Sequence, residues 1–475
     1  MNIIFASPEV APFAKTGGLA DVSASLPKAL SDISCRVTVI TPFYKSTKDM
    51  NLPLEPFLVA GFNFFLYREK EIEYVFVVND DYYDRSNLYS ESHGDYPDND
   101  LRFSYFSRAI AAFAAQNRGR PEVIHCNDWQ TGLVPLYLKA AKRKIKTLFT
   151  IHNIGYQGLF GYDALDRLCI PRRFYNVNGV EYYKKISLLK SGIVYSSAIS
   201  TVSRGYAREI LTPEFGCGME GILKTRARDL YGIVNGADYL KWDPAVDTHI
   251  AKNYGPETLE GKRECKERLV RDVNMPAETL KRPLIGVISR LAEQKGIDLI
   301  VEAAEEIIKR GASIIILGTG DAKYNSLCRN IAVRYPEYVS SHITFDNELA
   351  HKIEAGCDIF AMPSRYEPCG LNQLYSFRYG TLPVVRATGG LEDTVIDIDD
   401  DPERGSGIKF EKATREDLIG AVSRALKLYG DGARWQAVQR RIMKLDFSWK
   451  ASALRYEQLY AGLLGKNGTK GRPAL

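Results

Sequence analysis

Short apolar runs alternate with longer amphipathic segments along most of this chain. The short runs are rich in β-branched and aromatic residues, as buried strands are. Leu19–Leu30 and Arg102–Ala115 have instead the spacing of one apolar helix face. This alternation predicts parallel sheets with crossover helices. The strands predicted in the first half are Asn2–Ala6, Arg36–Thr41, Val123–Cys126, Thr147–Ile151 and Ala198–Val202.

Two further apolar segments, Phe57–Tyr67 and Glu73–Val78, have the pattern of a hairpin inserted into that framework. A second series of buried runs then begins after residue 283 and again alternates with helical patterns. Two doubly wound α/β domains therefore explain the chain most simply. The strands predicted in the second series are Leu284–Ser289, Ser313–Leu317, Ile343–Phe345, Asp358–Ala361 and Leu382–Val385.

The domain boundary is predicted near Val234-Asn-Gly-Ala-Asp238. A turn-forming Asn-Gly pair follows an apolar run there and precedes Trp242-Asp-Pro. The last helical pattern, Trp449–Leu464, lies beyond the second series of strands. From its residues alone, this helix can either cap the second domain or cross back to the first.

Length and charge agree with this organisation. A chain of 475 residues is too long for one ordinary domain, and a hydrophobic share of 45% supports two large cores. The 63 basic and 58 acidic residues leave a net charge of +5, and the basic residues form no long block. We therefore expect neither a nucleic acid nor an anionic membrane as a partner. The sequence carries no signal for a particular oligomeric state.

The spacing of the cysteines and histidines argues against a structural metal site and against disulfide bonds. The eight cysteines are far apart and form no C-x-x-C pair, and the six histidines form no H-E-x-x-H motif. This argues against a zinc cluster or a disulfide framework and fits a reducing compartment. Because the N-terminus also lacks a basic segment before its short first apolar run, we expect a cytoplasmic protein.

A glycine-containing loop, Pro12-Phe-Ala-Lys-Thr-Gly-Gly-Leu-Ala-Asp21, joins the first predicted strand to the first predicted helix. Glycines allow a close approach to the backbone, and a helix N-terminus attracts anions, so the loop can hold a phosphate. A tight turn without a ligand explains it equally well. Thr388-Gly-Gly-Leu-Glu-Asp393 repeats the pattern in the second domain and predicts a second helix N-terminus.

In the second domain, Ser289-Arg-Leu-Ala-Glu-Gln-Lys-Gly296 directly follows a predicted strand. Ligands of open α/β sheets bind at the carboxyl ends of strands. The Arg290 guanidinium matches phosphate oxygens in shape, and Lys295 adds a compact charge, so the pair suits a pyrophosphate. A solvated loop with two cations remains the alternative.

Pro363-Ser-Arg-Tyr-Glu-Pro-Cys-Gly-Leu371 also follows a strand and precedes a predicted helix from about Gly370 to Tyr379. Glu367 is expected at the mouth of a site, exposed and able to accept hydrogen bonds from sugar hydroxyls. It can also be an acid that merely complements the helix dipole.

Two neighbouring strands of the first domain end in similar polar segments. They are His125-Cys-Asn-Asp-Trp-Gln130 and Thr150-Ile-His-Asn-Ile-Gly-Tyr-Gln-Gly158. Both place donors and acceptors where ligands bind. A single histidine in such a place is more often part of the core, but the repetition favours a site.

Taken in order, five of these motifs resemble one family: Lys15-Thr-Gly-Gly-Leu, His152-Asn, Arg290 with Lys295, Glu367-Pro-Cys-Gly-Leu and Thr388-Gly-Gly-Leu. The set resembles the bacterial glycogen synthases and plant starch synthases, glycosyltransferase family five, from residue 1 to about residue 464.

That resemblance implies a GT-B fold, with two Rossmann-like domains facing a deep interdomain cleft. Residues 1–235 would form the glucan acceptor side and residues 236–448 the nucleotide-sugar donor side. Residues 449–475 would form a helix that crosses back to the first domain, followed by a flexible tail.

The implied reaction is transfer of glucose from ADP-glucose to the nonreducing 4-hydroxyl of an α-1,4-glucan such as glycogen or a maltooligosaccharide. It retains the anomeric configuration and needs neither a metal nor another cofactor. Without a metal, fixed cations and helix ends must compensate the charge of the departing diphosphate.

The resemblance also implies roles for individual residues. Arg290 and Lys295 match the diphosphate-binding pair, and Glu367 matches the carboxylate near the 3- and 4-hydroxyls of the donor sugar. His152 matches a contact to the donor glucose or acceptor, and Asp21 an acid that orders the site. The implied substrate-binding residues are Lys15, Gly17, Gly18, Asp128, Trp129, Asn153, Asn235, Phe345, Cys369, Gly370, Leu371 and Thr388.

The sequence departs from the family pattern at two of the motif positions. Phe345 stands where a tyrosine often stacks on the adenine, and Gln130 replaces a frequent histidine. Two other functions stay open: the same transfer from UDP-glucose, because phosphate-binding residues do not read the base, and an inactive glucan-binding protein on this fold.

Overall fold

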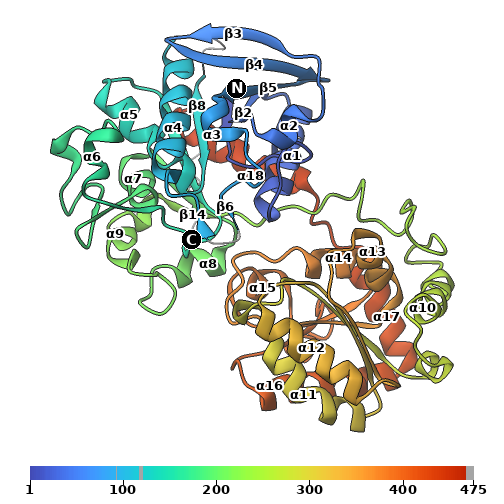
Figure 1. The fold of residues 1–475 in the computed structure, drawn as a ribbon. Coiled ribbons are helices and arrows are strands. Elements are labelled where there is room, and N and C mark those ends of the chain that lie inside the picture. The colour runs from blue at the N-terminus through green and yellow to red at the C-terminus, as the bar shows by residue number, and fades with distance from the viewer. Residues whose placement is uncertain (92–93, 117–120, 467–475) are drawn as a thin grey trace. The chain divides into compact units, whose positions relative to one another are not determined.

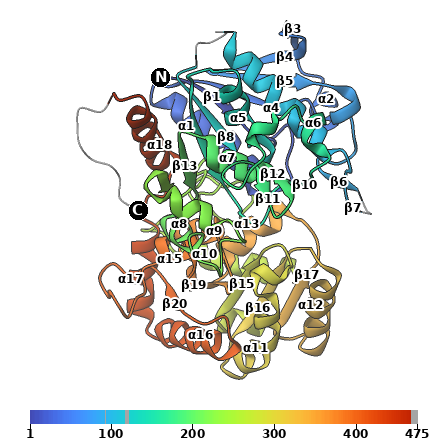
Figure 2. The same ribbon diagram turned by 90° about the vertical axis from the view of Figure 1, so that its left-hand side faces the viewer.

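Two wound parallel sheets organise the chain (Figures 1 and 2). The computed structural model describes residues 1–91, 94–116 and 121–466. The chain forms two compact units, each with its own sheet. The first contains Met1–Gly236 and the segment that begins at Trp449, and the second contains Ala237–Ser448.

The sheet of the first unit has the order β14-β13-β9-β8-β1-β2-β5-β4-β3. Its strands run parallel from β14 to β5, and the edge strands β4 and β3 are antiparallel. The strands are β1 (Asn2–Ala6), β2 (Arg36–Pro42), β3 (Glu55–Val59), β4 (Phe62–Glu69), β5 (Ile72–Val78), β8 (Val123–Asn127), β9 (Lys146–Ile151), β13 (Ala198–Thr201) and β14 (Leu230–Gly232).

The five strands predicted in the first half are present, with ends that differ by at most one residue. The predicted hairpin is present, because β4 and β5 pair antiparallel, but its description was wrong in two respects. The predicted strand Phe57–Tyr67 is two strands, β3 and β4, separated by a turn at Ala60 and Gly61, which both have positive φ. In addition, β5 pairs in parallel with β2 and is therefore part of the wound sheet rather than an insertion.

The second unit has one parallel sheet in the order β17-β16-β15-β18-β19-β20. Numbered along the chain, this is the order 3-2-1-4-5-6 of dinucleotide-binding folds. The strands are β15 (Leu284–Ile288), β16 (Ser313–Leu317), β17 (Val339–His342), β18 (Ile359–Met362), β19 (Leu382–Arg386) and β20 (Ile408–Phe410).

The predicted strand Ile343–Phe345 was wrong, because β17 ends at His342. β17 is the edge strand of its sheet, and only its first residue, Val339, is fully buried. An edge strand with polar positions gives a weak apolar pattern, so the more apolar residues that follow it gave the stronger strand signal.

Helices connect these strands as the sequence predicted. In the first unit they include α1 (Gly18–Asp32), α4 (Asn99–Ala115), α5 (Val134–Ala140), α7 (Leu188–Tyr195), α8 (Arg204–Glu209) and α9 (Glu220–Thr225). A small sheet of β10 (Leu159–Gly161), β12 (Lys185–Ser187) and β11 (Glu181–Tyr182) lies in the same unit. In the second unit the helices are α10 (Glu260–Asp272), α11 (Ile297–Lys309), α12 (Ala322–Arg334), α13 (Asn347–Gly356), α14 (Asn372–Tyr379), α15 (Gly389–Thr394), α16 (Arg415–Gly430) and α17 (Gly432–Ile442).

The last helix, α18 (Trp449–Leu463), belongs to the first unit, and Figure 1 shows its red ribbon among the blue elements there. Tyr456 and Tyr460 are fully buried in the core that also contains Phe5 and Leu26. The Tyr460 hydroxyl lies 2.7 Å from Nδ1 of His125 on β8. The helix therefore crosses back to the first unit, as the family resemblance implied.

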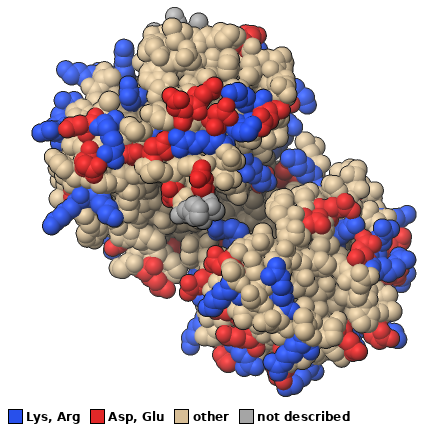
Figure 3. All heavy atoms as spheres, in the orientation of Figure 1, with Lys and Arg blue, Asp and Glu red and all other residues tan. Residues whose placement is uncertain are grey.

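Acidic and basic side chains are interspersed on the face of each unit that is turned to the viewer in Figure 3. Among the helices of the described residues, none has both the length and the apolar character needed to cross a membrane.

Candidate active site

The winding of each sheet reverses direction at one point, between β1 and β8 in the first unit and between β15 and β18 in the second. Ligands of such sheets bind outside the carboxyl ends of the strands at this switch point. Several of the predicted site residues follow the four strands that flank these points. The glycine loop follows β1, Asp128 follows β8, the Arg290–Lys295 segment follows β15 and Glu367 follows β18.

In the second unit, the structure brings Lys295 and Glu367 into direct contact. Nζ of Lys295 lies 2.5 Å from Oε2 of Glu367, and the Ser364 hydroxyl donates to the same oxygen at 3.0 Å. Glu367 is only 5% exposed and lies five residues before α14. The expectation of an exposed acid at the helix start was therefore wrong: this carboxylate is buried and paired with the predicted phosphate-binding lysine.

Arg290 lies on the same loop as Lys295. Its guanidinium donates to Oε1 of Gln294 at 3.2 Å, and Nε2 of Gln294 donates to the carbonyl of Tyr366 at 3.2 Å. Arg365 adds a two-pronged ion pair with Asp298 at the start of α11, at 2.8 and 2.6 Å. The loops after β15 and β18 are thereby held together, with two cations and one carboxylate at the switch point.

The loop after β19 packs onto the loop that carries Glu367. The amide of Gly390 donates to the carbonyl of Glu367 at 3.0 Å. A Cβ on Gly390 would lie 2.1 Å from the carbonyl oxygen of Cys369, so only glycine fits there. Cys369 and Thr388 are buried, whereas Gly370 and Leu371 are partly exposed. The second Thr-Gly-Gly motif therefore has a structural role in packing two loops, independent of any ligand.

In the first unit, the glycine loop differs from this second copy. Gly17 has an extended conformation (φ −150°) that any residue adopts. A Cβ added at Gly17 or Gly18 would meet no heavy atom of the described residues within 4 Å. Neither packing nor backbone strain thus requires these glycines, which fits a surface that a ligand approaches closely. Lys15 extends beside the loop and pairs with Asp21 at 2.7 Å.

Glu9 is a residue of this switch point that the sequence did not indicate. Its carboxylate is 5% exposed and accepts hydrogen bonds from the amides of Thr16 and Gly17 at 2.6 and 3.2 Å. These amides already have a carboxylate of the protein as their hydrogen-bond acceptor and do not await a phosphate. A single glutamate after a strand carries no pattern that could have revealed this arrangement.

Asp128 follows β8 in an unusual backbone conformation, with φ +55° and ψ 178°. Non-glycine residues adopt this region only under strain of about 1–3 kcal/mol, which is common at functional sites. Its Oδ1 accepts a hydrogen bond from the amide of His152 at 2.8 Å. Burial raises the pKa of this carboxyl group to about 7, and the nearby charge of Glu9 adds to the effect.

His152 is held at the end of β9 as a neutral imidazole, because burial lowers its pKa to about 3. The Asn127 amide donates to the carbonyl of Ala6 at 3.0 Å, which turns its Oδ1 toward Nε2 of His152 at 2.9 Å. Since Oδ1 only accepts, Nε2 carries the proton. Nδ1 of His152 therefore offers a lone pair to a ligand hydroxyl. The neighbouring Asn153 uses its side-chain oxygen in a local turn with Gly155.

His125 does not belong to the site, although its strand end resembles that of His152. Its ring is fully buried between the hydroxyls of Tyr460 and Thr150, at 2.7 and 2.6 Å. His125 is therefore the buried core histidine that the sequence left open as an alternative.

Three further predicted residues lie in different environments. The Trp129 ring contacts Phe103 edge-on, with 5.0 Å between ring centroids, and lies partly exposed. Asn235, at the end of the first unit, is 5% exposed, and its buried Oδ1 has no hydrogen-bond partner among the described residues. Phe345 lies on the loop between β17 and α13 and is 80% exposed, so its ring is accessible for stacking on a planar ligand.

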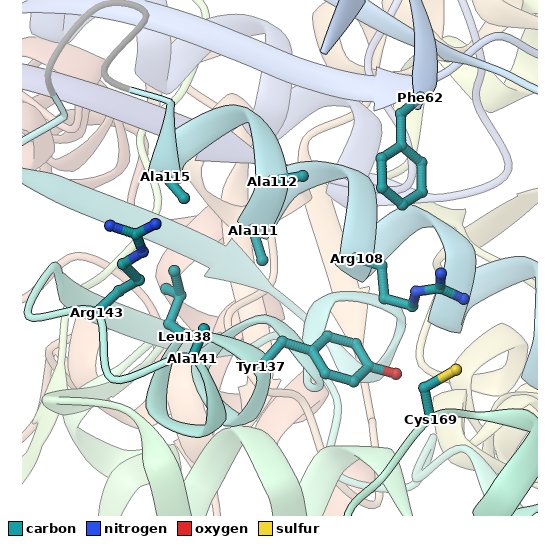
Figure 4. A pocket seen from close by; sticks show the side chains of 10 residues that line it. All are labelled: Phe62, Arg108, Ala111, Ala112, Ala115, Tyr137, Leu138, Ala141, Arg143 and Cys169. Atoms are coloured by element: carbon teal, nitrogen blue, oxygen red, sulfur yellow. The ribbon is translucent and has the colours of Figure 1, made fainter. Parts of the chain in front are cut away.

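A pocket of about 280 Å³ lies elsewhere on the first unit, between α4 and α5 (Figure 4). Three alanines of α4, Ala141 directly after α5 and the rings of Phe62 and Tyr137 line it, and it contains none of the predicted site residues. Within residues 1–91, 94–116 and 121–466, no three His, Cys, Asp or Glu side chains gather as metal ligands do.

Comparisons with known proteins show which family this chain is similar to. A family model described as the starch synthase catalytic domain matches residues 2–225, and one described as glycosyl transferases group 1 matches residues 271–441. A glycogen synthase of Geotalea daltonii is 43% identical over 489 residues, which cover 98% of this chain and 100% of the relative. A glycogen synthase of Anaeromyxobacter sp. (strain Fw109-5) is 44% identical, with 98% and 99% covered.

Solved structures show the same likeness. The catalytic domain of starch synthase IV from Arabidopsis thaliana, bound to ADP and acarbose, matches with a TM-score of 0.88 at 31% identity. The match covers 98% of this chain and 99% of that chain. A sucrose-phosphate synthase from Thermosynechococcus elongatus matches with a TM-score of 0.61 at 18% identity, which is a likeness of fold alone.

Proposed function

Because the chain belongs to the glycogen and starch synthase family of glycosyltransferases and has its GT-B fold, we propose that it transfers glucose from ADP-glucose to a growing α-1,4-glucan. The acceptor group is the nonreducing 4-hydroxyl of glycogen or of a maltooligosaccharide. The configuration at the anomeric carbon is retained, and the reaction needs no metal.

The observation that carries the proposal is the ion pair of Lys295 with the buried Glu367, with Arg290 on the same loop, at the switch point of the second unit. Two cations at the carboxyl ends of parallel strands suit a diphosphate. Glu367 is fixed by Lys295 and Ser364, so its remaining lone pairs can accept hydrogen bonds from the hydroxyls of the donor sugar.

Charge development explains why these groups matter. When the bond between the anomeric carbon and the diphosphate breaks, negative charge grows on the departing phosphate oxygen. Arg290 and Lys295 stabilise this charge, which is the contribution that the proposal assigns to fixed cations instead of a metal. The same phosphate oxygen takes the proton of the acceptor 4-hydroxyl. The hydroxyl oxygen then bonds to the anomeric carbon on the face that the leaving group vacates, which retains the configuration.

The proposal also assigns substrate contacts to residues of the first unit. Lys15 with Gly17 and Gly18 would contact the donor, and His152, Asp128, Trp129 and Asn235 would contact the glucose or the acceptor. The neutral His152 with a free lone pair at Nδ1 suits a hydroxyl of glucose. ADP is proposed as the nucleotide because the starch synthase IV structure holds ADP, and the exposed Phe345 would stack on its base.

The test is incorporation of labelled glucose into glycogen in the presence of EDTA, for the wild type and for Lys295→Ala. Losing one stabilising group of this kind lowers the rate by about 10²–10³-fold, and we expect a decrease of that size. Lys309→Ala is the matched control, because Lys309 forms a surface ion pair with Glu305 on α11. It should leave the rate unchanged.

Four outcomes would contradict parts of the proposal. Full activity of Lys295→Ala would remove Lys295 from the reaction, and loss of wild-type activity in EDTA would show a metal requirement. Higher activity with UDP-glucose than with ADP-glucose would overturn the choice of donor. A trapped covalent adduct of glucose with the enzyme would overturn the single-step retention mechanism.

A further inference from the structure

The carboxylate of Glu9 lies at the centre of a buried hydrogen-bond network. Besides the Thr16 and Gly17 amides on Oε2, it accepts the Thr16 hydroxyl at 2.7 Å and the Tyr89 hydroxyl at 2.8 Å, both on Oε1. Hydrogen bonds to an ionised acceptor are about twice as strong as neutral ones. The protein thus places its own carboxylate against the loop that the sequence analysis offered as a phosphate site.

The backbone of Glu9 is fixed as well. The Ser7 hydroxyl, at the end of β1, donates to the carbonyl of Glu9 at 2.8 Å and lies 2.8 Å from the Ser23 hydroxyl on α1. The end of β1, the glycine loop and the first turns of α1 are therefore connected through buried polar contacts.

Tyr89 is held independently of the glycine loop. The Asn99 side chain donates to the carbonyl of Tyr89 at 2.9 Å, and the buried Arg102 donates to the Asn99 oxygen at 2.6 Å. Burial raises the pKa of Tyr89 well above its usual value, so its hydroxyl stays a donor throughout the working pH range. A fixed point on the segment before α4 therefore holds the Glu9 carboxylate at Oε1, the oxygen that the loop amides do not use.

We propose that Glu9, braced by Tyr89, is a positioning residue that holds the glycine loop in the shape needed to bind the nucleotide sugar. Glu9 does not touch the substrate in this arrangement. It binds the Thr16 and Gly17 amides inward, so that the open side of Gly17 and Gly18 and the neighbouring Lys15 form the surface that meets the donor. The assignment rests on the proposed function for the identity of the donor.

Two substitutions of Glu9 separate hydrogen bonding from charge. In Glu9→Gln, the amide oxygen can still accept both backbone amides, while the new NH₂ group donates to the two hydroxyls, which can turn to accept. In Glu9→Ala, the Thr16 and Gly17 amides lose their partner. We expect Glu9→Ala to raise the KM for the nucleotide sugar about tenfold or more, with the KM for glycogen unchanged. Glu9→Gln should stay within about threefold of the wild type, because its hydrogen bonds are preserved.

Tyr89→Phe tests the hydrogen bond from Tyr89 to Glu9 with less risk to folding, because it removes only one hydroxyl group. It should raise the KM for the nucleotide sugar about threefold. Tyr137→Phe is the matched control: it also removes a buried tyrosine hydroxyl of the first unit, one that donates to the carbonyl of Leu168, away from the glycine loop. Its KM for the nucleotide sugar should equal that of the wild type.

Hydrogen exchange of the substrate-free protein supplies a readout that needs no activity. In Glu9→Ala, and to a smaller degree in Tyr89→Phe, the amides of residues 16 and 17 should exchange about tenfold faster or more, with the exchange of β15 unchanged. Unchanged exchange at the loop, or a parallel rise of both KM values in every variant, would overturn the positioning role. If the wild type transfers glucose from neither nucleotide sugar, the proposed function fails, whereas the exchange experiment still decides the role of Glu9.

Discussion

At the scale of single residues, the three buried or partly buried carboxylates of the switch points are neutralised in different ways. Glu367 is paired with a lysine, and Glu9 receives backbone amides and hydroxyls. Asp128 receives backbone amides and forms no ion pair among the described residues, which is why burial raises its pKa to about 7. A charge that is only partly compensated in a strained residue costs stability, and functional sites often tolerate this.

The shifted pKa values of Asp128 and His152 predict how the free energy of unfolding depends on pH. Between pH 3.8 and about 7, folded Asp128 keeps a proton that the unfolded chain releases, so its contribution to stability falls as the pH rises. His152 behaves in the opposite way: between pH 6.5 and about 3 the unfolded chain binds a proton that the folded protein does not, so stability falls as the pH is lowered. The two contributions offset each other over most of this window.

Asp128→Asn removes the titrating carboxyl group of Asp128 but keeps a side-chain oxygen that can accept the hydrogen bond of the His152 amide. We expect the variant to be at least as stable as the wild type at pH 8 and to lose stability more steeply between pH 6.5 and 4, because His152 is then uncompensated. Urea unfolding at several pH values measures this. A variant whose stability runs parallel to the wild type across that range would show that Asp128 does not titrate there.

At the scale of elements, the two Thr-Gly-Gly motifs precede helices at equivalent ends of their sheets but have different physical constraints. Gly390 is enclosed by the backbone of Cys369, whereas Gly17 borders open space. The first helix, α1, has 15 residues, and the second, α15, has six. The same local sequence therefore supports loop packing in one unit and an open surface in the other.

Alanine at each position tests this difference. Gly390→Ala should displace the loop that carries Glu367 and lower both stability, by about 1–3 kcal/mol, and activity. Gly17→Ala should change the free energy of unfolding by about 1 kcal/mol or less, because its only local cost is at the helix N-cap, yet raise the KM for the nucleotide sugar. Thermal unfolding and donor saturation curves distinguish the two. Wild-type KM in Gly17→Ala would mean that no ligand approaches the glycine loop.

At the scale of the whole molecule, the first unit is built from both ends of the chain. α18 contributes Trp449, Ala453, Tyr456, Leu459 and Tyr460 to its core, while the core of the second unit is formed within residues 237–448. Each unit therefore has its own hydrophobic stabilisation, but only the second is continuous in sequence.

Ending the chain after Ser448 should consequently affect the two units unequally. Loss of several buried aromatic side chains exposes the core of the first unit, so its calorimetric transition should shift to lower temperature or disappear. The transition of the second unit should persist. A chain that ends after Lys466 retains α18 and serves as the control. Equal destabilisation of both units would contradict the division.

Much of the fold was predictable from the pattern of apolar residues. Buried parallel strands give continuous apolar runs, so nearly all predicted core strands were correct to within one residue. The edge strand β17 was misplaced, β3 and β4 were predicted as one strand, and the short strands β14 and β20 were not predicted. The motifs also predicted which loops follow the strands at the switch points, and their order indicated the family. Local sequence suffices for this because strand burial and loop position leave a local pattern.

The partners of each side chain were decided by the tertiary structure. His125 lies within β8 and His152 follows the neighbouring β9, yet the first is buried against Tyr460 of α18, 335 residues away, and the second lies beside Asp128. Glu9 meets Tyr89 across 80 residues, and Lys295 meets Glu367 across 72. The sequence by itself determined the elements, the loops that follow them and the family. Only the packing of distant segments decided which charges are compensated, because a hydrogen-bond partner far along the chain leaves no periodic signal near the residue that it binds.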